Sequence, residues 1–195
     1  MDIKYSLLCA VFYIYYTLQA CVTETVTYIN TEHPEIIWID KKTFKNFTLI
    51  SRRINRQDPR HYVELYMHPL ITMDNTFKLD FYFYQLLTNR YRPSFVEMHF
   101  GFCDMVADSF FGKAFKQAFD NRTCPLPPGE YDFLNMTISY VPKGFPFTKG
   151  RIYCNASVER GGMSRHVGRG YINMELKTAR IEGKEKKNKK NNIKV

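Results

Sequence analysis

Four Asn-x-Ser/Thr triplets are the residues whose types and spacing most clearly permit chemistry, because such triplets accept N-linked glycans. Twelve Asn residues and a Ser/Thr share of about 11% would produce roughly one such triplet by chance. The excess predicts a glycoprotein of the eukaryotic secretory pathway. The candidate acceptors are Asn46, Asn121, Asn135 and Asn155, and none is followed by proline.

The N-terminus has the pattern of a secretory signal peptide. Lys4 precedes the apolar run YSLLCAVFYIYYTL, and Ala20 offers a small residue at a cleavage point. This run is shorter than the roughly twenty residues that a membrane span needs. We therefore expect residues 1–20 to be a cleaved signal and the mature protein to be extracellular, without stable membrane insertion. An uncleaved anchor is the alternative, since Cys21 and Val22 lengthen the apolar stretch.

The cysteines suggest disulfides rather than a metal site. Loss of Cys9 with the signal peptide leaves Cys21, Cys103, Cys124 and Cys154 in an oxidising compartment. These four allow three pairings, and none of the three is excluded by the spacing. No two of the four have the C-x₂-C spacing of a zinc site, so we expect no bound metal.

Side chains that could support catalysis form no recognisable pattern. The five histidines are scattered, and neither H-E-x-x-H nor G-x-S-x-G occurs in the sequence. We therefore expect a protein that is not an enzyme and needs no cofactor.

The positive charge is concentrated at the C-terminus. Eight Lys or Arg residues and two Glu residues between Lys177 and Val195 contribute +6 of the net charge of +9. We expect residues 177–195 to form a solvated, disordered tail, with binding to anionic lipid headgroups or acidic polysaccharide as the alternative. The remainder is only about +3, which does not favour nucleic acid as a partner.

Alternating apolar and polar residues predict several β-strands between these ends. Phe77, Leu79, Phe81 and Phe83 share one face, and the run from Ser94 to Phe102 turns Val96, Met98, Phe100 and Phe102 to one side. Shorter candidates lie at 36–39, 61–67 and 171–176, and a polar loop is expected at 51–61.

The glycan acceptors give an independent indication of strand orientation, because a glycan must face water. If Asn135 and Thr137 face outward, Leu134, Met136, Ile138 and Tyr140 face the core. If Asn155 and Ser157 face outward, the core-facing residues of that strand are Ile152, Cys154, Ala156 and Val158.

One segment has helical periodicity instead. Between Asp104 and Phe119, apolar residues recur at the spacing of an amphipathic helix, and Cys103 and Cys124 bracket this segment. If these cysteines pair, the bridge closes a loop of about twenty residues, which is worth roughly 3 kcal/mol in the chain-entropy model. The prolines of CPLPPG then end the helical region. The predicted fold is one domain, residues 21–176, that is mainly β: an antiparallel two-sheet sandwich with one short helical insert.

Two further features leave alternatives open. Sixteen Phe and fourteen Tyr residues would either fill the core or line a cavity for an apolar ligand. The basic stretch 159–170 is expected to be a flexible connection between two final strands. Its alternative is a loop at the mouth of a binding site, where Arg160, Arg165 and Arg169 would meet an acidic headgroup.

The central segment resembles a family of secreted insect proteins, grouped under a domain of unknown function, that includes the chemosensory proteins A and B. The shared features are an aromatic strand ending in Cys103, an amphipathic segment, Cys124-Pro125, an aromatic strand after Gly129, then Phe145-Pro146 and Gly150. The resemblance covers roughly residues 60–176.

This resemblance implies an immunoglobulin-like sandwich similar to the ganglioside activator and to the cholesterol-transfer proteins of the Niemann-Pick type, which hold a lipid between two sheets. It also implies a Cys103–Cys124 disulfide, which leaves Cys21 and Cys154 as the remaining pair. The basic tail is not part of the pattern.

The sequence therefore suggests a secreted, non-catalytic carrier of lipids or hydrophobic chemosensory signals. The residues expected to line its ligand site are Phe81, Phe83, Phe100, Phe102, Met136 and Ile138. The alternative is an extracellular interaction module with a filled core, which binds a receptor or an acidic surface through the basic loop and tail.

Overall fold

The computed structural model describes residues 25–108, 110–119, 123–138, 141 and 144–180. Residues Thr27–Lys177 form one compact unit, and the other described residues, 25–26 and 178–180, are the ends of two strands. The predicted signal peptide, Cys21, Asn121, Tyr140 and residues 181–195 of the predicted tail lie outside the described residues.

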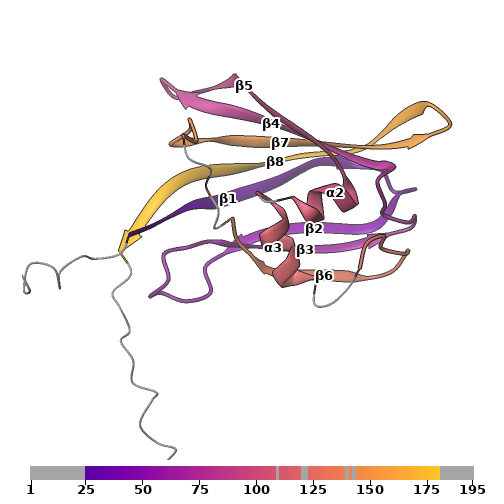
Figure 1. The fold of residues 1–195 in the computed structure, drawn as a ribbon, viewed down its shortest axis with the longest axis horizontal. Helices are drawn as coiled ribbons and strands as arrows, with labels where there is room; N and C mark the ends of the chain where they lie inside the picture. The colour runs from indigo at the N-terminus through magenta and orange to yellow at the C-terminus, as the bar shows by residue number, and fades with distance from the viewer. Residues whose placement is uncertain (1–24, 109, 120–122, 139–140, 142–143, 181–195) are drawn as a thin grey trace, which may run out of the picture. The chain divides into compact units, whose positions relative to one another are not determined.

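The larger sheet has five strands in the order β1-β8-β7-β4-β5 (Figure 1). β4 pairs antiparallel with both β5 and β7, and β7 pairs antiparallel with β8. The strands are β1 (Thr25–Ile39), β4 (Phe77–Leu87), β5 (Arg90–Gly101), β7 (Lys149–Arg160) and β8 (Met163–Arg180).

The smaller sheet has three antiparallel strands in the order β2-β3-β6. They are β2 (Phe44–Arg52), β3 (Tyr62–Pro69) and β6 (Tyr131–Met136). If β2, β3 and β6 are equated with strands A, B and E, and β4, β7 and β8 with C, F and G, the order is that of an immunoglobulin-like sandwich. The predicted fold class is confirmed: the protein is a mainly β, antiparallel two-sheet sandwich.

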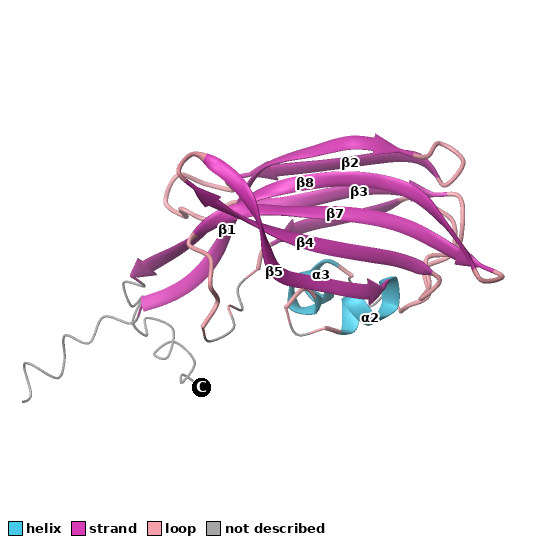
Figure 2. Ribbon diagram, turned by 90° about the horizontal axis from the view of Figure 1, so that it is seen from above, coloured by secondary structure: helices cyan, strands magenta, loops and turns pink. Residues whose placement is uncertain are grey.

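Two short helices replace the single predicted helix of residues 104–119. They are α2 (Phe102–Ala107) and α3 (Gly112–Ala118), and they lie together beside β5 (Figure 2). The side chain of Asp108 accepts hydrogen bonds from the backbone N–H groups of Phe110 (2.6 Å) and Phe111 (3.2 Å), which turns the chain between the helices. Because α2 contacts β4 and β5 while α3 contacts β6, the helices close one edge of the sandwich.

A disulfide joins Cys103, in α2, to Cys124, 21 residues later. Immediately after it, Leu126 and Met73 exchange backbone hydrogen bonds of 2.8 and 3.0 Å. The helical insert is therefore anchored at both ends to the segment that leads into β4.

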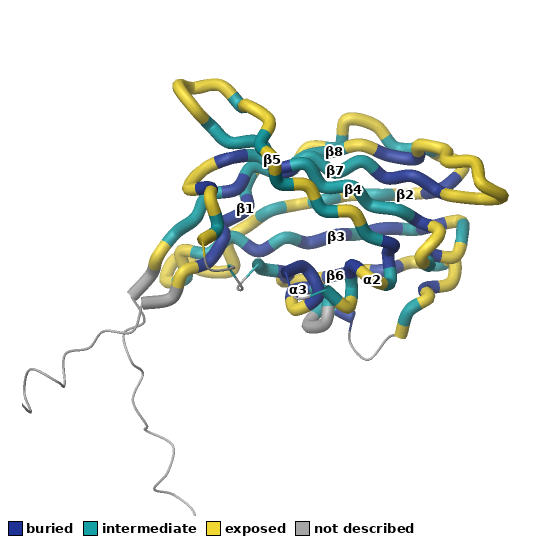
Figure 3. The backbone as a smooth tube through the Cα atoms, turned by 45° about the horizontal axis from the view of Figure 1, so that its top comes forward, coloured by how far each residue is buried: buried dark blue, intermediate teal, exposed yellow. Residues whose placement is uncertain are grey.

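The alternation predicted for the large sheet is confirmed at the positions that pack inward. Phe77, Phe83, Ile152, Ala156 and Val158 are buried. Leu79, Phe81, Val96, Met98 and Phe100 are partly buried and pack against the same core. Figure 3 shows buried residues concentrated along the strand interiors, with exposed residues at the hairpin ends.

The alternation predicted for residues 131–138 is confirmed at Met136 and Ile138 but is wrong at Leu134, because β6 contains a bulge. Asn135 has a positive φ of 56°, and the pairing of β6 with β3 shifts between Val63 and Leu65. The bulge inserts one residue into β6, so the residues before Asn135 face the opposite way from the predicted alternation. Phe133 is consequently buried, whereas Leu134, predicted to face the core, is 44% exposed.

The basic stretch 159–170 is mostly strand rather than a flexible connection. Only Gly161 and Gly162 separate β7 from β8, and their φ values of 57° and 77° are those of a two-residue I′ turn. β8 also continues to Arg180, so residues 177–180 of the predicted tail belong to a strand.

β1 contacts both sheets. The Ile29 N–H donates to the Ile138 carbonyl (3.2 Å) and the Ser51 hydroxyl donates to the Thr31 carbonyl (2.5 Å), on the side of the small sheet. Directly after β1, the Asp40 N–H donates to the Val167 carbonyl of β8 (2.8 Å). His33, with a φ of 51°, lies between these two parts. Residues 36–39, predicted as a short strand, are the end of this longer one.

Candidate ligand-binding cavity

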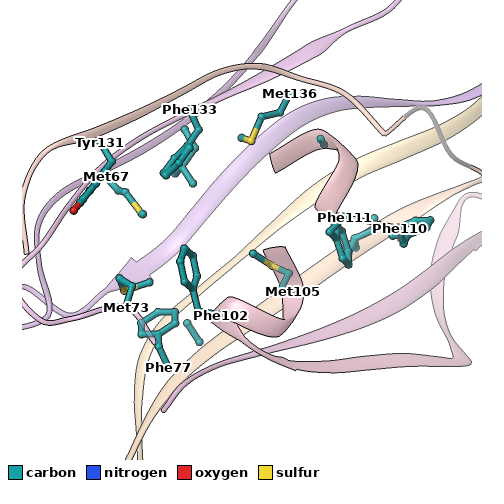
Figure 4. Close-up of a cluster of buried hydrophobic side chains, with 14 of the residues drawn as sticks. Met67, Met73, Phe77, Phe102, Met105, Phe110, Phe111, Tyr131, Phe133 and Met136 are labelled. Carbon is teal, nitrogen blue, oxygen red and sulfur yellow. The ribbon is translucent and has the colours of Figure 1, made fainter. Parts of the chain in front are cut away.

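A cavity of about 240 Å³ lies between the two sheets and the helices. The small sheet contributes Leu49, Val63, Leu65 and Met67, and the large sheet contributes Phe77, Leu79, Phe81, Ile152, Cys154, Ala156 and Ile172. Met105, Phe111, Ala114 and Phe115 border it from the helical insert. In the close-up of Figure 4, core side chains from β3, β6 and α2 point into the space between these elements.

Small side chains explain why this space is left open. Ala114 of α3 and Ala156 of β7 both border the cavity where a larger aliphatic residue would occupy it. Gly168 and Gly170 of β8 have no side chain to fill space, and a Cβ on Gly170 would lie 2.8 Å from the Glu35 carbonyl oxygen of β1. The glycines therefore allow β1 to approach closely, so that Ile36 and Ile39 complete the wall.

The cavity reaches the surface beside β1. Trp38 lines it and yet is 42% exposed. Since β1 and β2 are the strands at one edge of their respective sheets, this opening lies away from the edge that α2 and α3 close.

Four of the six residues predicted to line the ligand site border the cavity: Phe81, Phe102, Met136 and Ile138. The other two pack elsewhere. Phe83 stacks on Phe147 with ring centroids 6.0 Å apart, and Phe100 lies edge-on to Phe111 at 6.1 Å. Alternation identified the inward face of each strand, but it does not distinguish a position beside empty space from one beside another ring.

The contributions of β2, β3 and Trp38 to the cavity wall were not predicted from the sequence. The alternation of Phe47 and Leu49 with polar residues would have indicated β2. The alternation predicted around Asn135 also placed Thr137 on the outer face, whereas this residue borders the cavity. Thr137 lies beyond the last residue of β6, Met136, so the two-residue alternation of the strand does not extend to it.

The wall is mainly apolar. Its lining residues that carry a polar group in the side chain are Thr31, Trp38, Thr137, Cys154, Arg169 and Tyr171. The Thr137 hydroxyl oxygen is buried and has no hydrogen-bond partner in the described part of the chain. Cys154 is a free cysteine, and its suggested partner, Cys21, lies outside the described residues. Burial raises the pKa of the Cys154 thiol to about 12, so the group is neutral.

The basic loop does not present three free arginines. The Arg165 guanidinium donates to Asp40 (2.5 Å) and to the Thr43 hydroxyl (3.2 Å), which joins β8 to the turn between β1 and β2. The Arg169 guanidinium lies 5.8 Å from the centre of the Tyr153 ring. Arg165 thus has a structural role, contrary to the alternative in which it meets an acidic headgroup.

The glycan acceptors differ in exposure. Asn46 and Asn135 are exposed. Asn155 is half-buried, and its side-chain oxygen has no hydrogen-bond partner among the described residues. Ser157, the third residue of the same triplet, is buried beside a register shift in the β7–β8 pairing. The predicted outward face of β7 is therefore wrong at Ser157.

Within the described residues, no group of three or more His, Cys, Asp or Glu side chains is arranged to hold a metal ion. No helix in this part of the chain is both long and apolar enough to cross a bilayer. Comparison with known protein families finds no matching family model, and comparison with curated proteins finds no match.

Proposed function

We propose that this protein is a secreted, N-glycosylated, non-catalytic carrier that holds lipids or hydrophobic chemosensory signals between its two sheets. The observation that carries the proposal is the apolar cavity of about 240 Å³, which borders the surface at Trp38. Cavities of this kind, with few polar groups in an apolar wall, are typical of small-molecule sites.

The cavity volume suggests the size of the ligand. An apolar cavity of about 150 Å³ accommodates benzene, with its six carbon atoms, so 240 Å³ corresponds to about ten non-hydrogen atoms. A longer acyl chain would have to extend past Trp38 into solvent. Burial of each methylene would contribute about 0.8 kcal/mol to binding.

Secretion is supported by three independent features. The N-terminal apolar run, the four acceptor triplets and the Cys103–Cys124 disulfide all fit an oxidising secretory compartment. The resemblance to secreted insect chemosensory proteins implies the same compartment and the same class of ligand.

Native mass spectrometry of the protein secreted from insect cells, followed by organic extraction, tests the proposal. We expect a co-purifying apolar molecule at close to one-to-one stoichiometry. Ala156→Leu should abolish this, because three added carbon atoms would occupy about a third of the cavity. Ala107→Leu, at an exposed position of α2, is the matched control and should retain the ligand.

An apo mass that does not change after fatty acids, medium-chain alcohols and hydrocarbons are offered would contradict the carrier proposal. The interaction module would then be the better hypothesis. It predicts association with a partner that weakens with salt and with truncation after Arg180, whereas a carrier should survive that truncation.

A further inference from the structure

The Thr137 hydroxyl is the polar group of the cavity wall that the fold leaves unused. Buried hydroxyl groups in native proteins nearly always have a hydrogen-bond partner, and an exception needs an explanation. Thr137 comes directly after β6 and borders the cavity, and its buried oxygen has no partner among the described residues.

Neighbouring polar groups do not meet this need, because they bond to one another. The Ile29 N–H donates to the carbonyl of Ile138, the residue that follows Thr137. The Asn30 side chain accepts from the His61 N–H (2.7 Å) and donates to Glu32 (2.6 Å), and Ser51 donates to the Thr31 carbonyl. The hydrogen bonds around this end of the cavity are thus formed without the Thr137 hydroxyl.

We propose that Thr137 is the specificity-determining residue of the cavity, and that its hydroxyl bonds to a single neutral oxygen, a hydroxyl or a carbonyl, at one end of a ligand of about ten non-hydrogen atoms. This inference rests on the proposed carrier function. A hydroxyl both donates and accepts, so it pairs with either type of oxygen. A carboxylate at Thr137 is disfavoured, because one hydroxyl does not offset the cost of burying a charge.

The test uses 1-nonanol and n-decane, which have the same number of non-hydrogen atoms and differ in one hydroxyl group. Thr137→Val removes the protein hydroxyl with little change of shape, whereas Thr137→Ser keeps it. Because Thr137 also belongs to the Asn135 acceptor triplet, all variants carry Asn135→Gln, which removes any effect of a glycan at that position. Headspace gas chromatography measures the free concentration of both volatile ligands.

We expect Thr137→Val to weaken binding of 1-nonanol about tenfold and to change binding of n-decane less than twofold. Thr137→Ser should bind 1-nonanol nearly as well as the parent does. If Thr137→Val weakens both ligands equally, or neither, the assignment is overturned, and in the latter case the hydroxyl contacts only water. If the parent protein binds neither molecule, the proposed carrier function is contradicted as well. If the parent binds both and only the effect of Thr137→Val is absent, the role of Thr137 alone is contradicted.

Thermal unfolding of the ligand-free variants provides a second measurement. Loss of an unpaired buried hydroxyl should leave Thr137→Val at least as stable as the parent. A lower melting temperature would mean that the hydroxyl has a partner within the protein and would overturn the assignment. Should Thr137→Val not fold, a nuclear Overhauser contact between the Thr137 methyl group and C1 of nonanol in the parent decides the matter. A contact to the other end of the chain would contradict the proposed orientation.

Discussion

At the scale of single residues, burial decides what the polar groups of this sandwich can do. Cys154 lies on the inner face of β7 and borders the cavity, and its thiol is neutral because burial raises its pKa to about 12. A cysteine reacts through its thiolate, so a buried neutral thiol is inert. Cys154 has no disulfide partner among the described residues, and it forms part of the mainly apolar cavity wall.

We predict that Cys154 resists alkylation in the folded protein. In a Cys21→Ser background, iodoacetamide at pH 8 should modify Cys154 about a thousandfold more slowly than an exposed thiol, because so little thiolate is present. Mass spectrometry after timed quenching measures the rate, and full modification in denaturant is the control. Modification at the rate of a free cysteine would contradict the burial of this side chain.

Asp58 couples the stability of the loop before β3 to pH. Its carboxylate accepts from Arg60 Nη2 (2.7 Å) and from the Tyr62 hydroxyl (2.7 Å). The hydrogen bonds from the Arg60 side chain, together with that of Tyr62, lower the pKa of Asp58 well below its usual value. A carboxyl group whose pKa is lower in the folded state stabilises the protein above its unfolded pKa, near 4, and loses this contribution as the pH falls through the folded value.

We therefore predict that Asp58→Asn lowers the free energy of unfolding at pH 7 and reduces its decrease between pH 4 and pH 2. Urea denaturation across this pH range measures both effects. Asp132→Asn, at an exposed position of β6, is the matched control. Identical acid profiles for the parent and Asp58→Asn would refute the role assigned to this carboxylate.

At the scale of elements, two short helices close the edge that the sheets leave open. Neither helix is long enough to be stable alone, since isolated helices shorter than about twelve residues are marginal in water. They hold their positions through buried residues such as Phe102, Met105, Phe111 and Ala114, and through the Cys103–Cys124 disulfide. The cavity wall on this side thus depends on that bridge.

Replacing both cysteines of the bridge by serine should lower the free energy of unfolding by about 3 kcal/mol, the chain-entropy value for a loop of this length. We also expect faster amide hydrogen exchange in α2 and α3 than in β4 or β7, because the strands keep their ladders. Chemical denaturation and hydrogen exchange measure these effects. Exchange that increases equally in all elements would argue against a local role for the disulfide.

At the scale of the whole molecule, the side chains of the sandwich do not fill its core completely. Rings pack against one another on both sides of the cavity, as in the Phe81–Phe111 stack at 4.5 Å, while Ala114 and Ala156 leave room between them. An empty apolar cavity lowers stability relative to a filled core. A ligand that fills it should therefore stabilise the folded protein.

We predict that 1-nonanol raises the melting temperature of the parent protein and not that of Ala156→Leu. At a ligand concentration of 100 times the dissociation constant, the free energy of unfolding should rise by about 2.7 kcal/mol. Scanning calorimetry at several ligand concentrations measures the shift. Equal shifts in both proteins would indicate binding outside the cavity.

The sequence by itself determined the inward faces of β4 and β5, because the two-residue period of a β-strand is local. It also indicated the helical insert, and the resemblance implied the Cys103–Cys124 pairing. It did not reveal that Phe81 borders the cavity whereas Phe83 and Phe100 do not, because free volume depends on side chains from elements far apart in the chain. Nor did alternation reveal the bulge at Asn135, which depends on the register of β6 against β3. The tertiary structure alone placed Thr137 in the cavity wall, and that placement sets the expected ligand chemistry.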